Sequence, residues 1–526
     1  MPAPGTPPPE RFNFARDILE RNAGRRAKVA YVDDSVSLTF GDLDARVRQA
    51  ADAYLALGLR RDERVLLCMH DTVDFPVAFL GALFAGIVPV AVNTLLTADD
   101  YAYMLAHSRA QALIVSAALL PTFTQAMAHR GHDVKHIVVS RPVASPARDM
   151  PENAIDFASW IGSAGAMAHA VDTAADDMAF WLYSSGSTGR PKGTVHTHAN
   201  LHWTAALYGK PVLGLDEGDV VFSAAKLFFA YGLGNALTFP LTAGATTILM
   251  ADRATPQAVF QRLRQHRPTI FCGVPTLYAA MLAAKDLPAR NDVALRRCIS
   301  AGEALPREVG EKFAAHFGCE ILDGIGSTEM LHIFLSNLPG EVRYGTTGKP
   351  VPGYDIELRG DDGRPVAIDT IGDLYIRGPS AALFYWANRE RTRATFQGEW
   401  TKSGDKYTCG ADGYYTYAGR SDDMLKVSGQ YVSPFEVEAA LMRHDAVLEA
   451  AVVGQVGDDG LTRTLAYVVL KPERDGDAAL ATALQAFVKD QLAPYKYPRE
   501  IRFLAELPKT ATGKIQRFRL REGAAE

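Results

Sequence analysis

A glycine- and hydroxyl-rich stretch over residues 183–193 holds the most closely spaced candidate ligand-binding groups in this 526-residue chain. It reads Tyr-Ser-Ser-Gly-Ser-Thr-Gly-Arg-Pro-Lys-Gly. Glycines permit close backbone approach, so N–H groups can converge on an anion, while hydroxyls and a lysine add rotatable donors and positive charge. The stretch therefore predicts a polyphosphate site made by Ser184, Ser185, Gly186, Ser187, Thr188, Gly189 and Lys192.

The flanking residues distinguish this loop from a Walker-type phosphate loop. An apolar run, 178–182, precedes it and a β-favouring run, 194–197, follows it, so the loop connects two predicted strands. A Walker loop instead leads directly into a helix. Without a helix N-terminus to hold the anion, we expect a mobile loop that can release pyrophosphate. The alternative is a solvated Gly/Ser hairpin.

Two more polar loops follow predicted strands at residues 297–300 and 320–323. Ligands of open α/β sheets bind at the carboxyl ends of strands, so both loops are candidate ligand contacts. In the second loop a hydroxyl, Thr328, stands beside a carboxylate, Glu329. A carboxylate near a polyphosphate can hold Mg²⁺, and a hydroxyl can bond to a phosphate oxygen. A plain turn and an acidic helix N-cap are the structural alternatives.

The pattern of elements predicts an α/β protein of two domains. Helical patterns alternate with short β-rich runs over residues 12–142 and again over about 200–329, which favours α/β subdomains with parallel sheets. Short β segments separated by Gly/Asp turns then indicate a small β-barrel-like subdomain. A capping box at residues 433–436 opens a helix in a final α+β unit. We therefore predict a large N-terminal domain, 1–421, and a small mobile C-terminal domain, 422–526.

Composition restricts the class of protein. With 48% hydrophobic and 22% charged residues, the chain is typical of soluble globular proteins, and a net charge of −5 predicts no nucleic-acid partner. The apolar stretch 75–92 is divided by Gly81, Gly86 and Pro89, so we expect a buried helix and strand and no membrane partner. The five cysteines are scattered singly, which favours buried thiols and a cytoplasmic location.

The loop at 183–193 resembles the phosphate-binding signature of the acyl-adenylate-forming superfamily, which includes acyl- and aryl-CoA ligases, luciferases and the adenylation domains of peptide synthetases. Further motifs follow in the family's order. The resemblance implies contacts to ATP or AMP from Gly302, Glu303, Ala304, Asp323, Gly324, Asp405 and Arg420. The family usually has an aromatic residue where Asp323 stands, which leaves the adenine contact there open. Asp405 and Arg420 would bind the ribose, because carboxylate and guanidinium pair well with hydroxyls.

The resemblance also implies roles near the C-terminus. Lys514 matches the family's catalytic lysine, and a cation there would counter the repulsion between substrate carboxylate and α-phosphate. Asp422 matches a hinge, and Lys426, Ser428 and Gly429 match the segment that meets coenzyme A in the second half-reaction. A solvated basic tail and a plain linker are the alternatives.

The expected substrate is a compact aryl carboxylate. The resemblance implies an acid pocket formed by Ala230, Tyr231, Gly232, Gly326, His332 and Ile333. Tyrosine offers a flat wall with one polar tip. Core packing is the alternative, and we prefer it for Phe228 and Phe229.

Over nearly its whole length the sequence is most similar to bacterial benzoate-CoA ligases of aromatic-compound catabolism. This resemblance implies ATP, Mg²⁺ and coenzyme A as cofactors, and benzoyl-adenylate as the intermediate. Alternatives are a ligase for another aryl or short-chain acid, a module that loads a carrier-protein thiol, and a nucleotide-binding regulator without turnover. A homodimer is compatible with the sequence.

Overall fold

The structure is a computed structural model in which residues 5–128, 131–141, 150–151, 153–184, 190–421, 424–427, 430–456, 462–472, 474–492, 496–509 and 515–522 are described. It divides into two compact units. Unit 1 comprises Met1–Ile356 and Ile376–Lys402, and unit 2 comprises Glu357–Tyr375 and Ser403–Glu526. The predicted hinge, Asp422, lies outside the described residues, so the boundary at 421/422 stays a prediction.

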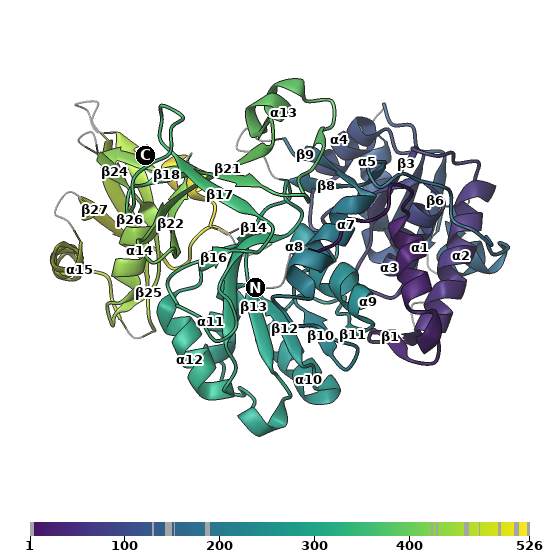
Figure 1. The fold of residues 1–526 in the computed structure, drawn as a ribbon. Coiled ribbons are helices and arrows are strands. Elements are labelled where there is room, and N and C mark those ends of the chain that lie inside the picture. Colours follow the sequence, from purple (N-terminus) through teal and green to yellow (C-terminus); the bar gives the residue numbers. More distant parts are fainter. Residues whose placement is uncertain are drawn as a thin grey trace. The chain divides into compact units, whose positions relative to one another are not determined.

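The first sheet of unit 1 contains the strands on either side of the predicted phosphate loop, β8 (Met178–Ser184) and β9 (Lys192–Thr197) (Figure 1). In the described residues its order is β19 (Phe384–Tyr385), β9 (Lys192–Thr197), β8 (Met178–Ser184), β4 (Val88–Ala91), β3 (Arg64–Cys68), β5 (Ala112–Ser116), β6 (His136–Ser140) and β7 (Ala154–Asp156). The strands from β8 to β7 pair in parallel, whereas β9 runs antiparallel to both its neighbours. Strands β3, β4 and β5 are apolar almost throughout, as expected for parallel strands that helices cover on both faces.

The second sheet of unit 1 carries the other two polar loops. Its order in the described residues is β16 (Lys349–Pro350), β15 (Ile333–Ser336), β14 (Ile321–Gly326), β13 (Arg297–Ser300), β12 (Ile270–Gly273), β10 (Val220–Ser223), β11 (Thr246–Ile248), β1 (Val29–Val32) and β2 (Ser37–Thr39). Strands β13 and β14 are parallel neighbours in which Ser300 pairs with Asp323, so their carboxyl ends lie side by side.

The helices of unit 1 are α1 (Phe14–Arg21), α2 (Phe40–Ala56), α3 (Asp74–Phe84), α4 (Ala98–Ser108), α5 (Leu120–Met127), α6 (Phe157–Gly162), α7 (His198–Thr204), α8 (Ala230–Leu233), α9 (Phe239–Ala243), α10 (Pro256–His266), α11 (Pro275–Ala283), α12 (Arg307–Phe317) and α13 (Arg389–Thr395). Most of them lie within the two predicted α/β series, whereas α6 and α13 fall outside them. The apolar stretch 75–92 forms the buried helix α3 and the buried strand β4, as predicted. Within the described residues, no helix has both the length and the apolar character needed to cross a membrane.

A third sheet contains β17 (Asp355–Arg359), β18 (Gly372–Arg377), β21 (Trp400–Cys409) and β20 (Phe396–Gln397), with β22 (Tyr415–Arg420) paired to β21. It corresponds to the predicted barrel-like subdomain. Unit 2 also holds β23 (Leu425–Val427), β24 (Gln430–Val432), α14 (Pro434–Met442), β25 (Val447–Val456), β26 (Thr462–Leu470), α15 (Ala478–Gln491), β27 (Glu500–Phe503) and α16 (Arg517–Glu522). The Ser433 hydroxyl caps α14 by accepting from the N–H of Glu436 at 3.1 Å. The predicted α/β fold class is confirmed.

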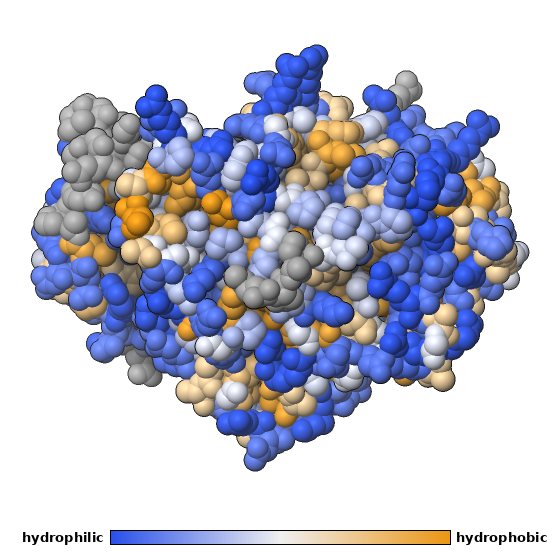
Figure 2. Space-filling view, viewed as in Figure 1, coloured by the Kyte–Doolittle hydropathy of each residue, from blue (hydrophilic) through white to orange (hydrophobic). Residues whose placement is uncertain are grey.

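Apolar surface is sparse on the visible face, where hydrophobic residues form small separate patches in a mostly hydrophilic surface (Figure 2). Among the described residues, the exposed large apolar side chains are Leu55, Leu95, Ile368, Leu383, Leu448 and Phe518. Such isolated residues are normal on protein surfaces.

Candidate active site

The strands on both sides of the predicted phosphate loop are confirmed. Strand β8 ends at Ser184 and β9 begins at Lys192, and these two residues are antiparallel partners. The loop is therefore a strand-to-strand connection, unlike a Walker loop. Ser185, Gly186, Ser187, Thr188 and Gly189 lie outside the described residues.

Helix α4 holds the residues on both sides of this loop, which the sequence did not suggest. The Tyr103 hydroxyl donates to the carbonyl of Pro191 at 3.2 Å, and the Arg190 guanidinium lies 5.1 Å from the centre of the Tyr103 ring. One turn further along, His107 Nδ1 lies 2.8 Å from the Tyr183 hydroxyl. Burial lowers the pKa of His107, so its imidazole is neutral at pH 7.

Glu329 lies directly beside the two strand ends. Its Oε1 accepts hydrogen bonds from the Tyr385 hydroxyl at 2.7 Å and from Ser184 Oγ at 3.3 Å, and Lys192 Nζ lies 3.8 Å away. Burial opposes ionisation of this carboxyl, but Lys192 and Tyr385 outweigh it and hold the pKa below its usual value. Glu329 is therefore an ionised carboxylate with its side chain 14% exposed.

The backbone before Glu329 is fixed by a neutral histidine. His196 Nε2 donates to the Thr328 carbonyl at 2.8 Å, while Asn200 Nδ2 donates to His196 Nδ1 at 3.1 Å. Burial lowers the pKa of His196 to about 4, which agrees with this single tautomer. The strand that leaves the phosphate loop thus positions the Thr328–Glu329 pair.

Asp323 supports the neighbouring loop at residues 301–305. Its Oδ2 accepts from the N–H of Leu305 at 3.4 Å, and the residue is 4% exposed. Gly302 adopts φ +94°, and the position where a Cβ would stand is open space. Asp323 therefore contacts the backbone of this loop. Glu303 and Ala304 are half-buried in the same loop, and Gly324 faces the carbonyl of Leu335.

Replacing Asp323 with asparagine should stabilise the protein increasingly as pH rises. Burial raises the pKa of Asp323 to about 8. In the unfolded chain the carboxyl ionises near pH 4, so the wild type loses stability between about pH 4 and pH 8, by at most about 1.4 kcal/mol per pH unit. Asparagine does not titrate. Melting temperatures of both proteins from about pH 5 to pH 9 should diverge up to about pH 8 and then stay parallel; a pH-independent difference would contradict the raised pKa.

The predicted acid-pocket residues Tyr231 and His332 are brought together, with ring centroids 5.7 Å apart. Rings of Tyr208 and Phe239 also pack on His332, at 5.2 and 4.5 Å. His332 is 2% exposed, neither ring nitrogen has a hydrogen-bond partner, and burial lowers its pKa to about 3. The histidine is therefore neutral and supplies no counter-charge.

Several residues of the predicted pocket, Tyr231 among them, lie in close contact with backbone carbonyls. The Tyr231 hydroxyl lies 3.1 Å from the carbonyls of both Gly273 and Ile299, so its hydrogen-bond donor is directed to the protein's own backbone. A Cβ on Gly232 would lie 2.0 Å from the Lys226 carbonyl, and one on Gly326 would lie 2.5 Å from that of His332. Ala230 is half-buried and Ile333 is buried. Phe228 belongs to the hydrophobic core, as we preferred, and Phe229 packs against it.

The predicted ribose residues form an ion pair in unit 2. Asp405 and Arg420 are antiparallel partners on β21 and β22, and Arg420 Nη1 lies 3.1 Å from Asp405 Oδ1. The next residue, Lys406, is 5% exposed and pairs with Asp373 at 3.1 Å. Lys426 lies on β23, but Asp422, Ser428, Gly429 and Lys514 are outside the described residues.

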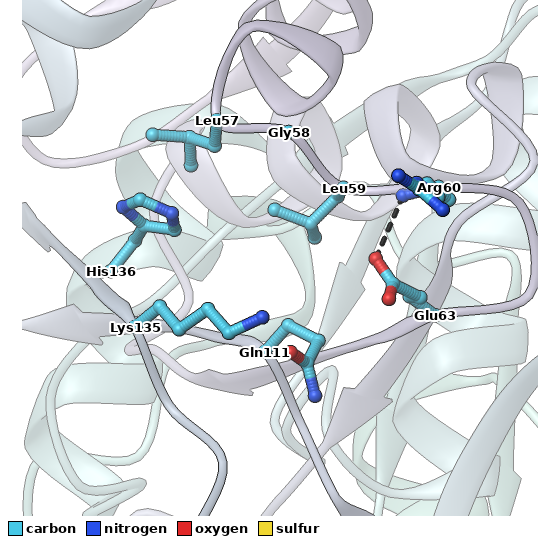
Figure 3. Close-up of a pocket in the computed structure, with 8 residues that line it drawn as sticks. All are labelled: Leu57, Gly58, Leu59, Arg60, Glu63, Gln111, Lys135 and His136. Carbon is cyan, nitrogen blue, oxygen red and sulfur yellow. Dashed lines mark hydrogen bonds between the residues drawn. The ribbon is translucent and has the colours of Figure 1, made fainter.

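The structure also has a polar pocket in unit 1, shown in Figure 3. Its lining includes Glu63, Gln111 and Lys135, which precede β3, β5 and β6. It therefore opens at the amino-terminal edge of the first sheet, whereas the phosphate loop follows the carboxyl end of β8. The pocket contains none of the predicted site residues.

Comparison with known proteins shows the family to which the chain belongs. Residues 19–386 match the family "AMP-binding enzyme", and residues 436–514 match its C-terminal domain. The chain belongs to the AMP-binding enzyme family. It is 56% identical to a benzoate–CoA ligase of Thauera aromatica over 98% of both chains. It is 47% identical to a 4-hydroxybenzoate–CoA/benzoate–CoA ligase of Rhodopseudomonas palustris, over 97% of this chain and 94% of the other.

Two solved structures share the fold. A benzoate CoA ligase from Burkholderia xenovorans LB400 matches with a TM-score of 0.90 at 61% identity, covering 97% of this chain and 100% of that one. The anthranilate CoA ligase AuaEII, solved in complex with anthranoyl-AMP, matches with a TM-score of 0.92 at 42% identity, covering 98% of each chain.

Proposed function

We propose that this enzyme activates benzoate with ATP to benzoyl-adenylate, releases pyrophosphate, and transfers the benzoyl group to coenzyme A, giving benzoyl-CoA and AMP. The observation that carries the proposal is the position of Glu329, an ionised carboxylate that contacts Ser184 and Lys192 at the two ends of the predicted phosphate-binding loop. The chain is also 56% identical to a benzoate–CoA ligase. Aryl-CoA ligases are also prominent among its other relatives.

Glu329 fits a Mg²⁺ ligand. Mg²⁺ prefers oxygen ligands and commonly binds through one or two carboxylates together with phosphates and water. A Mg²⁺ bound by Glu329 and ATP would neutralise charge on the phosphates. Ser184 and Lys192, beside the same carboxylate, would bind phosphate oxygens, and Thr328 would bond to the α-phosphate.

The remaining assignments follow from the chemistry of each group. Asp405 and Arg420 would exchange their ion pair for contacts to the ribose hydroxyls. Lys514 would lie between benzoate and α-phosphate, because two anions must approach each other there. Neutral His332 and the ring of Tyr231 would form the wall of an acid pocket that favours a ring without a second charge. Rotation about Asp422 would then bring Lys426, Ser428 and Gly429 to coenzyme A.

A panel of acids tests this function. We expect coenzyme-A-dependent AMP production to have its highest kcat/KM with benzoate, and lower values with 4-hydroxybenzoate, anthranilate and short aliphatic acids. A preference for another acid would replace benzoate as the substrate. AMP release only with a carrier-protein thiol would identify a loading module, and ATP binding without turnover would identify a regulator.

A further inference from the structure

Tyr385 lies at the active site although no sequence motif pointed to it. It is the last residue of β19, which pairs with β9, the strand that leaves the phosphate loop. The N–H groups of Leu383 and Trp386 donate to the carbonyls of Val195 and Gly193 at 2.9 and 2.8 Å. The Trp386 ring packs 4.6 Å from that of Trp181, and its indole N–H donates to the His107 carbonyl. The backbone on both sides of Tyr385 is therefore fixed.

The Tyr385 hydroxyl stands between two opposite charges. It donates to Glu329 Oε1 at 2.7 Å and accepts from Lys192 Nζ at 3.2 Å. The Lys192 ammonium also lies 4.4 Å from the centre of the Tyr385 ring. As a result, Lys192 Nζ and Glu329 Oε1 are 3.8 Å apart, beyond direct hydrogen-bond distance.

A direct contact between these two groups would impair both. An ammonium and a carboxylate attract strongly where water is scarce, and the Glu329 and Lys192 side chains are only 14% and 20% exposed. If they paired directly, Lys192 would occupy an oxygen that a metal needs, and Glu329 would neutralise a cation that phosphate needs. The Tyr385 hydroxyl gives each group a hydrogen-bond partner, while the ammonium and the carboxylate stay 3.8 Å apart.

We infer that Tyr385 is a positioning residue for the ATP half-reaction, whose hydroxyl orients the Glu329 carboxylate for Mg²⁺ and keeps Lys192 from hydrogen-bonding to it directly. The inference rests on the proposed function, which assigns Mg²⁺ to Glu329. Groups that orient a metal ligand typically change metal affinity by about 10–100-fold when removed.

The test compares ATP binding by calorimetry in EDTA with binding in Mg²⁺, without benzoate, so that no reaction occurs. The ratio of the two Kd values is the metal-dependent gain. In Tyr385→Phe we expect this gain to fall by about 10–100-fold, and the Mg²⁺ concentration needed for benzoate-dependent pyrophosphate exchange to rise correspondingly. The KM for benzoate should not change. A gain equal to that of the wild type would overturn the inference.

Tyr54→Phe is the matched control. It also removes a tyrosine hydroxyl within unit 1, one that donates to the Ala78 carbonyl at 3.1 Å. We expect it to keep the wild-type gain, whereas an equal loss in both variants would show a merely structural effect and overturn the inference. In a Lys192→Met background, Tyr385→Phe should reduce the gain less, because no ammonium remains to pair with Glu329.

The Glu329→Gln variant distinguishes a failure of the Tyr385 role from a failure of the Mg²⁺ assignment to Glu329. If this variant keeps the metal-dependent gain, the assignment of Mg²⁺ to Glu329 is wrong, and the role of Tyr385 is overturned with it. If Glu329→Gln loses the gain while Tyr385→Phe keeps it, only the role of Tyr385 is overturned.

Discussion

Replacing Lys514 with alanine should reduce benzoyl-adenylate formation by about 10³-fold, because a cation aimed at the reacting anions stabilises mainly the transition state. Transfer of the benzoyl group from supplied benzoyl-adenylate to coenzyme A should continue at close to the wild-type rate, since Lys514 has no part in our account of that step. Benzoate-dependent ATP–pyrophosphate exchange measures the first half-reaction, and thioester formation from synthetic benzoyl-adenylate measures the second.

Lys509→Ala is the control for a general loss of positive charge in this segment. Lys509 lies five positions before Lys514 and pairs with Glu449 at 2.6 Å. Exposed or half-exposed ion pairs contribute little to stability, so this variant should retain both half-reactions. If Lys514→Ala folds normally but loses both half-reactions to the same extent, the assigned role of Lys514 is wrong.

Replacing Glu329 with glutamine should reduce pyrophosphate exchange by about two to three powers of ten, because the loss of one carboxylate at the phosphates removes several kcal/mol of charge stabilisation. The amide keeps the size of the side chain and can still accept from Tyr385. Excess Mg²⁺ should restore only part of the activity, and the KM for benzoate should change little.

Glu341→Gln is the matched control for this change. Glu341 is also in unit 1, but its side chain is 57% exposed and pairs with Lys349 at 3.2 Å. It should retain wild-type exchange at every Mg²⁺ concentration. Wild-type Mg²⁺ dependence in Glu329→Gln would contradict the metal assignment.

Local patterns were sufficient to predict the elements that carry the site. The apolar run and the β-favouring run on either side of the glycine-rich loop form β8 and β9. The polar loops at the ends of β13 and β14 lie side by side because these strands are parallel neighbours.

Strand pairing over long distances could not be predicted in the same way. Strands β1 and β2 belong in sequence to the first α/β series, yet β1 pairs with β11 of the second sheet. Likewise β8 joins β4 of the first sheet across 86 intervening residues, from Val92 to Asp177. The alternation of helices and strands sets the local element, but the free energy that selects a partner strand comes from tertiary packing.

The same limit applies to individual side chains. Tyr385 and Glu329 are 56 residues apart in the chain and meet because β19 pairs with β9 and the N–H of Ala382 donates to the Glu329 carbonyl at 2.8 Å. Tyr103 and His107 reach the phosphate loop from a helix about 80 residues upstream, and neither stands in a recognisable motif. The departure at Asp323 was visible in the sequence, but its contact with the N–H of Leu305 depends on the loop's backbone geometry.

Transfer of oxygen from substrate to nucleotide tests the central claim most directly. Benzoate labelled with ¹⁸O in both carboxylate oxygens is converted with ATP, Mg²⁺ and coenzyme A, and the phosphorus products are analysed by mass spectrometry. If the carboxylate attacks the α-phosphate, each benzoyl-CoA formed leaves one ¹⁸O in AMP and none in pyrophosphate. Label in orthophosphate together with ADP, or AMP without label, would contradict an acyl-adenylate.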